Sequence, residues 1–468
     1  MTGVGGSRRP SGWGLGDDDR NPSPFPHRWD RGIESAFRLP ALFRLESRLQ
    51  AVLSSSFVHR CSAMITRIEA LNYRCFRLVG QNLGPFHILV GPNASGKSTF
   101  LDVPALLRDL SSVPGQDIGD VISTRSRDYR DLLWMRQGSH FELAIEARIP
   151  EDLRQHLSMG EAVCYYYVGV GALGGVGELG FVGECLLVGP PLEPGEPWNP
   201  DELPQARRGY KTIMVRGPGG GVEYHPEGQS GRVWAMPVGS RRSGLANLPK
   251  DESNFPVATW FLQFLVERVR SVAFTSKALR QPSPPNARRA FMPDGSSIPW
   301  LVEQLAPKDK DYEQWIAHLR TELPDLVGIR SVERQEDRHR YLMLKYEGGL
   351  EVPSWVVSDG TLEMLALTLL PYLPDKEVTY LVEEPENCVH PTAIGAIFES
   401  LSSVYDGQVL MATHSPVILG LAELEHVLCF TKDEKGAIRI VPGKEHRVLR
   451  NWRGEVSLGV LFASGVMG

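Results

Sequence analysis

The chain has 468 residues, of which 42% are hydrophobic and 23% charged, and its formal net charge is −6 at pH 7. This length suits two or three domains with a large core, and the charge balance lacks the global basicity that indicates a nucleic-acid-binding protein. The six cysteines form no Cys-x-x-Cys pair, and no run reaches the roughly 20 apolar residues of a membrane span. We therefore expect a cytoplasmic protein that does not itself enter a membrane, and an ATPase subunit of a transporter would need a separate membrane partner.

Residues 1–63 differ in composition from the rest of the chain. Gly, Pro, Ser, Arg and Asp dominate up to Asp30 without apolar periodicity, which predicts disorder, whereas residues 33–60 have the pattern of a short amphipathic helix. Met64 directly precedes Ile65–Leu71, an apolar run that predicts the first strand. Our simplest hypothesis is an over-extended gene start, which native peptides from before Met64 would contradict.

A phosphate-binding loop is predicted after the short apolar run Phe86–Val90. The residues that follow fit Gly-x-x-x-x-Gly-Lys-[Ser/Thr] and are Gly91, Pro92, Asn93, Ala94, Ser95, Gly96, Lys97, Ser98 and Thr99. Backbone N–H groups of such a loop, and the helix that begins near Lys97, bind phosphate oxygens. Lys97 would reach the β- and γ-phosphates, and the Ser98 hydroxyl would bind Mg²⁺. The expected ligands are ATP and Mg²⁺.

Residues 64–150 are predicted to form the N-terminal part of the nucleotide-binding core. Phe141–Ile149 alternates in polarity, which indicates an antiparallel edge section. Residues 151–255 contain short strand-like runs between Gly- and Pro-rich turns, which predicts a β-rich insertion. A docking platform and a surface decoration both fit this pattern.

Residues 256–340 are predicted to form a mainly helical arm subdomain. Six basic residues occur there without an acidic residue between them, namely Arg268, Arg270, Lys277, Arg280, Arg288 and Arg289. Such a cluster could contact the phosphate backbone of DNA, and a solvated face or a docking site for an acidic partner fits equally. No heptad run sustains a long coiled coil.

Residues 341–468 are predicted to complete the core. The turn Ser358-Asp359-Gly360-Thr361 leads into the apolar run Leu362–Leu370. A small polar turn of this kind at a helix N-terminus is a potential anion site, and it is also an ordinary helix cap.

Two later apolar runs end in polar residues. Thr379–Val382 is followed by Glu383, Glu384, Pro385, Glu386 and Asn387. A buried strand that ends in two carboxylates suits an ATPase, in which the first supports the Mg²⁺ shell and the second polarises the attacking water. The run Gln408–Thr413 leads to His414, which would lie at a strand end where it could contact the γ-phosphate and the water.

The order of these motifs, with His390-Pro391 after the acidic pair, resembles the ABC-type branch of the AAA-family ATPases. That branch is related to RecF, to the structural-maintenance-of-chromosomes proteins and to the overcoming-lysogenisation-defect nucleases. The resemblance covers roughly residues 64–468. It implies an α/β P-loop NTPase fold of ABC-ATPase type, with a mixed sheet flanked by helices.

The resemblance also implies roles for individual residues. Glu383 would be the Walker B acid, Glu384 the catalytic base and His414 the switch histidine. Ser358, Asp359 and Gly360 would be the signature motif, which in this family completes the ATP site of a second subunit. Two ATP molecules are then sandwiched in a head-to-tail homodimer.

Two positions depart from the family pattern. Glu383 stands where Asp is commoner, so its contact with Mg²⁺ runs one methylene further. The glutamine of the Q-loop, a further Mg²⁺ ligand, is best matched by Gln137, although an ordinary loop residue fits that position equally.

Two functions remain open at this level. About fifty residues follow His414, too few for the nuclease domain that overcoming-lysogenisation-defect proteins carry at this end. The first function is a switch or sensor in bacterial defence, with a separate, nuclease-like effector protein encoded nearby. The second is a RecF-like DNA-repair ATPase that binds DNA directly. A non-catalytic scaffold is disfavoured, because it would have no use for an intact acidic pair.

Overall fold

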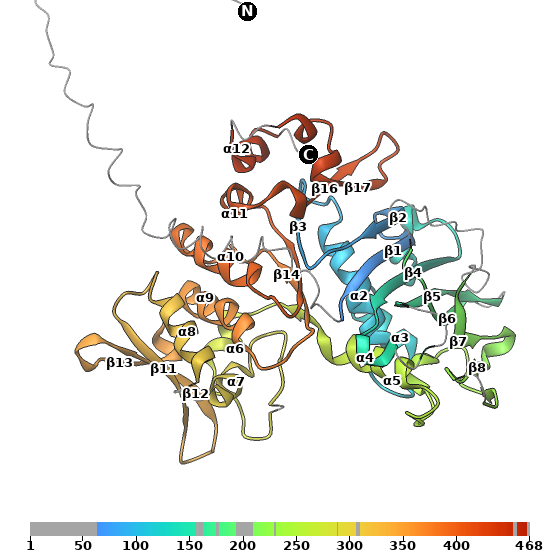
Figure 1. Ribbon diagram of the computed structural model, residues 1–468, viewed down its shortest axis with the longest axis horizontal. Helices are drawn as coiled ribbons and strands as arrows, with labels where there is room; N and C mark the ends of the chain where they lie inside the picture. Colours follow the sequence, from blue (N-terminus) through green and yellow to red (C-terminus); the bar gives the residue numbers. More distant parts are fainter. Residues whose placement is uncertain are drawn as a thin grey trace, which may run out of the picture. The chain divides into compact units, whose positions relative to one another are not determined.

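The computed structural model describes residues 63–465, except for 155–156, 158–161, 175–176, 193–208, 229–230, 288, 306–308 and 453–455. The predictions for the N-terminal extension therefore concern a segment that lies, apart from its last residue, outside the described residues. The described part of the chain has a mixed α/β fold (Figure 1).

A largely parallel sheet carries the predicted phosphate loop and acidic pair. Its order is β10–β14–β15–β3–β16–β17, and only the pairing of β16 with β17 is antiparallel. The strands are β10 (Val269–Val272), β14 (Thr379–Glu383), β15 (Gln408–Ala412), β3 (Phe86–Val90), β16 (Val427–Lys432) and β17 (Ile438–Pro442). Leu89 and Leu381 belong to one apolar cluster, whereas Ile88 and Val382 belong to another. The central strands are thus buried on both faces, which explains their continuous apolar runs.

An eight-stranded antiparallel sheet has the order β2–β1–β4–β5–β6–β7–β8–β9. Its strands are β1 (Ile65–Tyr73), β2 (Phe76–Asn82), β4 (His140–Arg148), β5 (Val163–Leu173), β6 (Glu178–Gly189), β7 (Lys211–Arg216), β8 (Val222–Tyr224) and β9 (Trp234–Met236). The predicted insertion, residues 151–255, supplies β5 to β9, so these strands extend the sheet of β1, β2 and β4. Strand β4 is antiparallel as predicted, but it lies between β1 and β5 and not at an edge.

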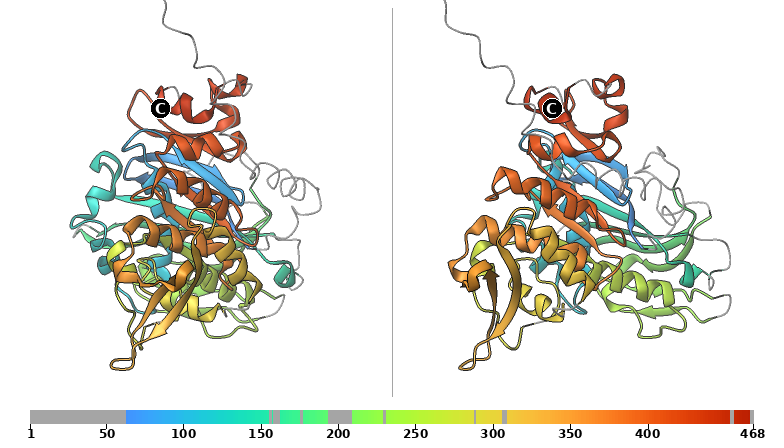
Figure 2. Two further views of the ribbon diagram at one scale, coloured as in Figure 1. Left: turned by 90° about the vertical axis from the view of Figure 1, so that its left-hand side faces the viewer. Right: turned by 60° about the vertical axis from the view of Figure 1, so that its left-hand side comes forward.

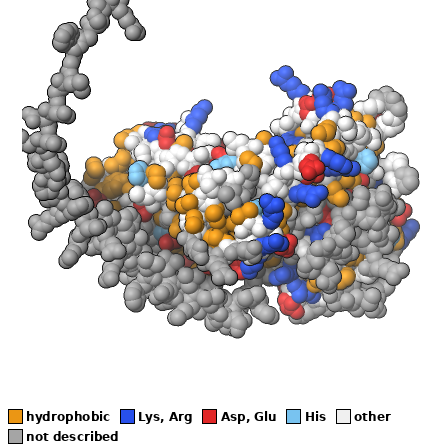
Figure 3. All heavy atoms as spheres, turned by 90° about the horizontal axis from the view of Figure 1, so that it is seen from above, with side chains coloured by type: hydrophobic (Ala, Val, Ile, Leu, Met, Phe, Trp, Pro, Cys, Tyr) orange, Lys and Arg blue, Asp and Glu red, His pale blue; other side chains and the backbone are white. Residues whose placement is uncertain are grey.

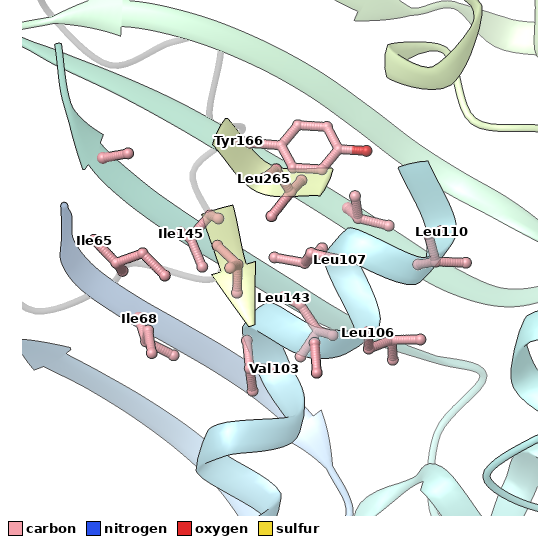
Figure 4. Close-up of a cluster of buried hydrophobic side chains, with 14 of the residues drawn as sticks. Ile65, Ile68, Val103, Leu106, Leu107, Leu110, Leu143, Ile145, Tyr166 and Leu265 are labelled. Carbon is pink, nitrogen blue, oxygen red and sulfur yellow. The ribbon is translucent and has the colours of Figure 1, made fainter. Parts of the chain in front are cut away.

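Helix α2 (Lys97–Ser111), which follows the phosphate loop, contacts strands of both sheets. Figure 4 shows its apolar side chains beside those of β1, β4 and β5; the labelled members are Val103, Leu106, Leu107, Leu110, Ile65, Ile68, Leu143, Ile145 and Tyr166. Burying a side chain of this size contributes about 1.5–3 kcal/mol. This packing holds the N-terminal turn of α2, where Lys97 and Ser98 lie.

Helices α10 (Ile394–Ser402) and α11 (Pro416–Leu421) share the second apolar cluster with the parallel sheet (Figures 1 and 2). Helices α8 (Lys310–Leu319) and α9 (Asp359–Leu369) join the same cluster with a three-stranded antiparallel sheet of β11 (Leu326–Glu333), β12 (Arg340–Tyr346) and β13 (Glu351–Pro353). The remaining helices are α3 (Ile118–Ser123), α4 (Glu151–Arg154), α5 (Pro256–Gln263), α6 (Ser276–Arg280), α7 (Ile298–Gln304) and α12 (Leu458–Ala463). None of the helices in the described ranges is long and apolar enough to cross a membrane.

The predicted helical arm, residues 256–340, contains both helices and strands. The segment contains α5 to α8, but it also supplies β10 to the parallel sheet and β11 to the three-stranded sheet. Strand β10 is only four residues long, which is too short for a periodic signal. Its Arg270 forms an ion pair with Asp375, a residue distant in sequence.

Candidate functional site

The loop between β3 and α2 has a backbone that depends on glycine at two positions. Gly91 and Gly96 have φ values of 154° and 94°. A Cβ atom at Gly91 would lie 2.6 Å from the Phe430 carbonyl oxygen, and one at Gly96 would lie 2.7 Å from Cys75 Sγ. Strand β16 and the turn between β1 and β2 therefore enclose the loop too closely for larger residues.

The Lys97 side chain folds back across this loop. Its Nζ donates hydrogen bonds to the carbonyl oxygens of Gly91 (3.0 Å) and Pro92 (3.1 Å) and to Ser95 Oγ (3.4 Å). Burial lowers the pKa of Lys97, and the carboxylates of Glu384, Glu386 and Glu383 act in the opposite direction. If phosphate binds here, its oxygens would replace these carbonyl oxygens as hydrogen-bond acceptors of the Lys97 ammonium group.

The phosphate loop and the acidic pair meet at one contact. Ser98 Oγ donates a hydrogen bond of 2.8 Å to Glu383 Oε2, although the two residues are 285 positions apart. A hydroxyl and a carboxylate are hard oxygen donors, which Mg²⁺ prefers. The residues therefore fit a Mg²⁺ ion. Glu383 stands where aspartate is commoner, and its longer side chain still contacts Ser98.

Glu384 lies just beyond the end of β14, beside the end of β15. Its φ of 46° is unusual for a residue other than glycine, and its N–H donates to the Ala412 carbonyl oxygen at 2.8 Å. Asn387 Nδ2 donates to Glu384 Oε2 at 2.7 Å, and His414 Nε2 lies 3.9 Å from Glu384 Oε1. The parallel pairing of β14 with β15 thus places the predicted base and the predicted switch histidine side by side.

The imidazole of His414 is surrounded by charges of both signs. Burial lowers its pKa, and the ammonium of Lys97 lowers it further, whereas the carboxylates of Glu384 and Glu386 raise it. The lowered pKa favours a neutral imidazole, which can either donate or accept a hydrogen bond.

A third carboxylate, Glu386, also belongs to this site, and the sequence analysis gave it no role. Its Oε1 accepts hydrogen bonds from Thr413 Oγ1 (2.7 Å) and from the backbone N–H of His414 (2.8 Å). The sequence shows Glu386 within the Glu-Glu-Pro-Glu run, but it could not predict the contact with the end of β15.

The predicted signature turn is built as a helix cap. Ser358 is the N-cap of α9, and its Oγ accepts a hydrogen bond from Thr361 N–H at 3.3 Å. Arg280 from α6 donates to Asp359 Oδ1 at 2.6 and 2.9 Å and to the Trp355 carbonyl oxygen at 3.0 Å. These contacts within the chain fix the position of the turn.

Gly360 brings the signature turn against the segment that follows the acidic pair. A Cβ atom at this position would lie 2.5 Å from the Cys388 carbonyl oxygen, so only glycine permits the approach. Within the described residues, no hydrogen bond or ion pair joins Ser358, Asp359 or Gly360 to the phosphate loop. The turn is thus packed against the segment after the acidic pair, without a hydrogen bond to the phosphate loop in the described part of the chain.

Gln137 is an exposed residue in the loop before β4. Its backbone carbonyl accepts a hydrogen bond from Asn72 Nδ2 at 2.9 Å. No hydrogen bond in the described part of the chain joins its side chain to Ser98 or Glu383. Its role as a Mg²⁺ ligand stays a prediction.

Three of the six residues in the predicted basic cluster pair with acidic residues from elsewhere in the chain, and Arg288 lies outside the described residues. Arg268 and Arg270 form ion pairs with Asp375, and Arg280 pairs with Asp359. On the face shown in Figure 3, basic and acidic side chains are interspersed. Pairing partners so far apart in sequence could not be anticipated from the local run.

Together, the parallel sheet and the groups at its strand ends define a mixed α/β protein with the elements of a P-loop nucleotide site. Residues 229–420 match the family described as "AAA domain, putative AbiEii toxin, Type IV TA system". This match spans less than half of the chain, and it confirms the predicted relation to the ABC-type AAA-family ATPases. The matched range includes the signature turn, the acidic pair and His414, whereas the phosphate loop precedes it.

Solved structures of Smc head domains resemble the chain at low sequence identity. A Smc head bound to the C-winged helix domain of ScpA is 14% identical, with a TM-score of 0.47 over 81% of this chain and 96% of the other. A Smc head derived from Pyrococcus furiosus is 13% identical, with a TM-score of 0.41 over 81% and 96%. The head domain from Thermotoga maritima is 12% identical, with a TM-score of 0.36 over 81% and 98%. No curated protein matches the sequence.

Proposed function

We propose that the protein hydrolyses ATP and that two copies close head-to-tail around two ATP molecules. The observation that carries this proposal is the hydrogen bond from Ser98 to Glu383, which joins the phosphate loop to the acidic pair. The second part is supported by the exposure of Ser358 and Asp359 at the N-terminus of α9, where a second copy could reach them.

In the proposed reaction, Lys97 binds the phosphate oxygens; Ser98 and Glu383 would hold Mg²⁺, which would neutralise charge on the phosphates. Glu384 accepts a proton from water as the water oxygen attacks the γ-phosphorus. The bond between that phosphorus and the β–γ bridging oxygen breaks, which yields ADP and phosphate. His414 orients this water. The Nε2 atom of His414 lies 3.9 Å from Glu384 Oε1, so both side chains can reach the same water.

Closure of the dimer is a population shift in this proposal. The γ-phosphate contacts the Ser358–Gly360 turn of the second copy only in the closed state, so ATP stabilises that state and hydrolysis reopens it. The ATP-dependent change in assembly is what makes the protein a switch.

The variant Glu384→Gln tests both parts of the proposal. Loss of the base stops hydrolysis while ATP binding remains, so the variant should form a stable dimer when ATP and Mg²⁺ are present. Light scattering should show the dimer mass with ATP and the monomer mass without it. The double variant Lys97→Ala/Glu384→Gln is the control, because it should stay monomeric in both conditions. A monomeric Glu384→Gln protein with bound ATP would contradict the sandwich dimer.

We further propose that this switch acts in bacterial defence and controls a separate effector protein. The description of the matched family names a type IV toxin–antitoxin system, which supports a role of this kind. A nuclease-like protein encoded by a neighbouring gene is the expected effector. If the proposal holds, the effector should copurify with the Glu384→Gln variant of this protein but not with the Lys97→Ala variant.

A RecF-like function in DNA repair is the second candidate. The basic segment at residues 268–289 favours it, although Arg268, Arg270 and Arg280 already have acidic partners. ATP turnover should be measured for the full chain with and without duplex DNA, at several salt concentrations. Strong, salt-sensitive stimulation would support direct DNA binding, because contacts with phosphates weaken as salt rises. ATP turnover that does not change with DNA would favour the first candidate, a switch controlled by a protein partner.

A further inference from the structure

Glu386 connects the ends of the two central strands. It lies three residues after the end of β14, yet its Oε1 accepts hydrogen bonds from groups just beyond the end of β15. The donors are Thr413 Oγ1 at 2.7 Å and the His414 N–H at 2.8 Å. One oxygen atom therefore holds the backbone of the residue that carries the imidazole.

The Thr413 hydroxyl extends this contact to the next helix. It donates to Glu386 and accepts a hydrogen bond from Ser415 N–H at 2.9 Å. Ser415 is in turn the N-cap of α11, where its Oγ accepts from Ile418 N–H at 3.3 Å. His414 thus lies in the middle of a turn that Glu386 fixes at its first half and α11 at its second.

The other oxygen of Glu386 is buried and has no hydrogen-bond partner among the described residues. A buried carboxylate oxygen without a partner is costly, and such atoms concentrate at functional sites. The Glu386 carboxyl group also lies close enough to Lys97 and His414 to raise the pKa of both side chains.

We propose that Glu386 is a positioning residue for hydrolysis, which acts by holding the Thr413–His414 strand end so that the imidazole faces Glu384. This inference rests on the proposed ATPase function and adds a third acidic residue to the pair predicted from the sequence. Glu386 acts through His414, so removal of either residue should impair the same step.

A double-mutant cycle in the full-length protein tests this dependence. Glu386→Ala should lower kcat at least tenfold, while KM and the calorimetric Kd for ATP change less than twofold. Glu386→Ala/His414→Ala should be no slower than His414→Ala alone, because the positioning group has nothing left to position. Rate losses that multiply would show that Glu386 does not act through His414 and would overturn the inference.

The conservative variant separates the hydrogen bond from the charge. Glu386→Gln keeps an acceptor oxygen for Thr413 and His414, and it should restore kcat to within about threefold of wild type. A Glu386→Gln protein that is folded and binds ATP but turns over as slowly as Glu386→Ala would also overturn the inference. Glu434→Ala, at an exposed glutamate in the turn between β16 and β17, is the matched control and should leave kcat unchanged.

A second variant covers the possibility that Glu386→Ala does not fold, as judged by thermal melting. Thr413→Val removes the hydroxyl but keeps the shape of this fully buried side chain. It should lower kcat, and the double variant Thr413→Val/His414→Ala should be no slower than His414→Ala alone. An unchanged kcat, or a loss additive with His414→Ala, would contradict the proposed role. Wild-type turnover equal to that of Lys97→Ala would instead overturn the proposed ATPase function itself.

Discussion

The strand-end site and the signature turn are built in different ways. At the strand ends, groups from three distant parts of the chain contact one another, as Ser98 with Glu383 and Glu386 with His414 demonstrate. The signature turn instead contacts Arg280 and the backbone at Cys388. Ser358 and Asp359 remain exposed.

This difference indicates a division of labour between binding and assembly. In the proposed function, the strand-end site would bind Mg²⁺ and phosphate within one chain, whereas the preformed signature turn would serve a second copy. A preformed helix cap loses little conformational freedom on binding, so closure of a dimer would need little reordering at this point. Variants of the first region should therefore affect ATP binding, and variants of the second should affect only turnover and assembly.

The largest effect is expected for Lys97→Ala. Charge-assisted hydrogen bonds contribute roughly 1.5–3 kcal/mol, and tenfold in affinity corresponds to about 1.4 kcal/mol, so ATP affinity should fall roughly 10- to 100-fold. Titration calorimetry with the wild type and the variant measures this directly. Retained affinity would mean that the loop does not bind phosphate.

Lys97→Met is the matched variant for this prediction. It keeps most of the buried side-chain volume and removes the ammonium group, so it should lose ATP affinity as strongly as Lys97→Ala. If only the alanine variant lost affinity, packing of the loop and not the charge of Lys97 would be responsible.

A smaller effect is expected for Gly360→Ala. Alanine favours a helix by up to about 1 kcal/mol over glycine, but here its Cβ would meet the Cys388 carbonyl oxygen at 2.5 Å. The clash should displace the turn and lower ATP turnover roughly tenfold, since overpacking costs about 1–3 kcal/mol. ATP affinity of the monomer should stay unchanged, in contrast to the Lys97 variants.

Gly395→Ala is the control for the clash. Gly395 lies in α10, and a Cβ there would meet no atom within 4 Å. This variant should keep full turnover and melt at the same temperature as the wild type or higher. Equal loss of turnover in both variants would indicate a general effect on the helices and not a specific contact of the signature turn.

The features that sequence predicted best are local ones. The glycine spacing from Gly91 to Gly96, the Ser358 cap and the carboxylates after Val382 each depend on residues close together in the chain. Apolar runs with no alternation predicted β3, β14 and β15, because strands covered on both faces need apolar residues throughout. These elements place the strand-end site.

Long-range contacts account for what the sequence could not show. Strand β10 is defined by its pairing with β14, and the predicted insertion proved to extend a sheet that begins at β1. Glu386 has a position in the site only because β14 and β15 are neighbours. The arginines at 268, 270 and 280 were predicted as one basic cluster, because their partners Asp375 and Asp359 follow about eighty residues or more later.

The smallest effect is expected for Arg280→Ala. An ion pair as exposed as that of Arg280 with Asp359 contributes only about 0.2–1 kcal/mol, so stability should hardly change. Turnover should fall two- to fivefold, because Arg280 also fixes the Trp355 carbonyl group directly before the signature turn. Arg330→Ala, which removes a comparably exposed ion pair with Glu351, should leave turnover unchanged. If the two variants behaved alike, the signature turn would not depend on Arg280, and the contrast between the two regions would rest on Gly360 alone.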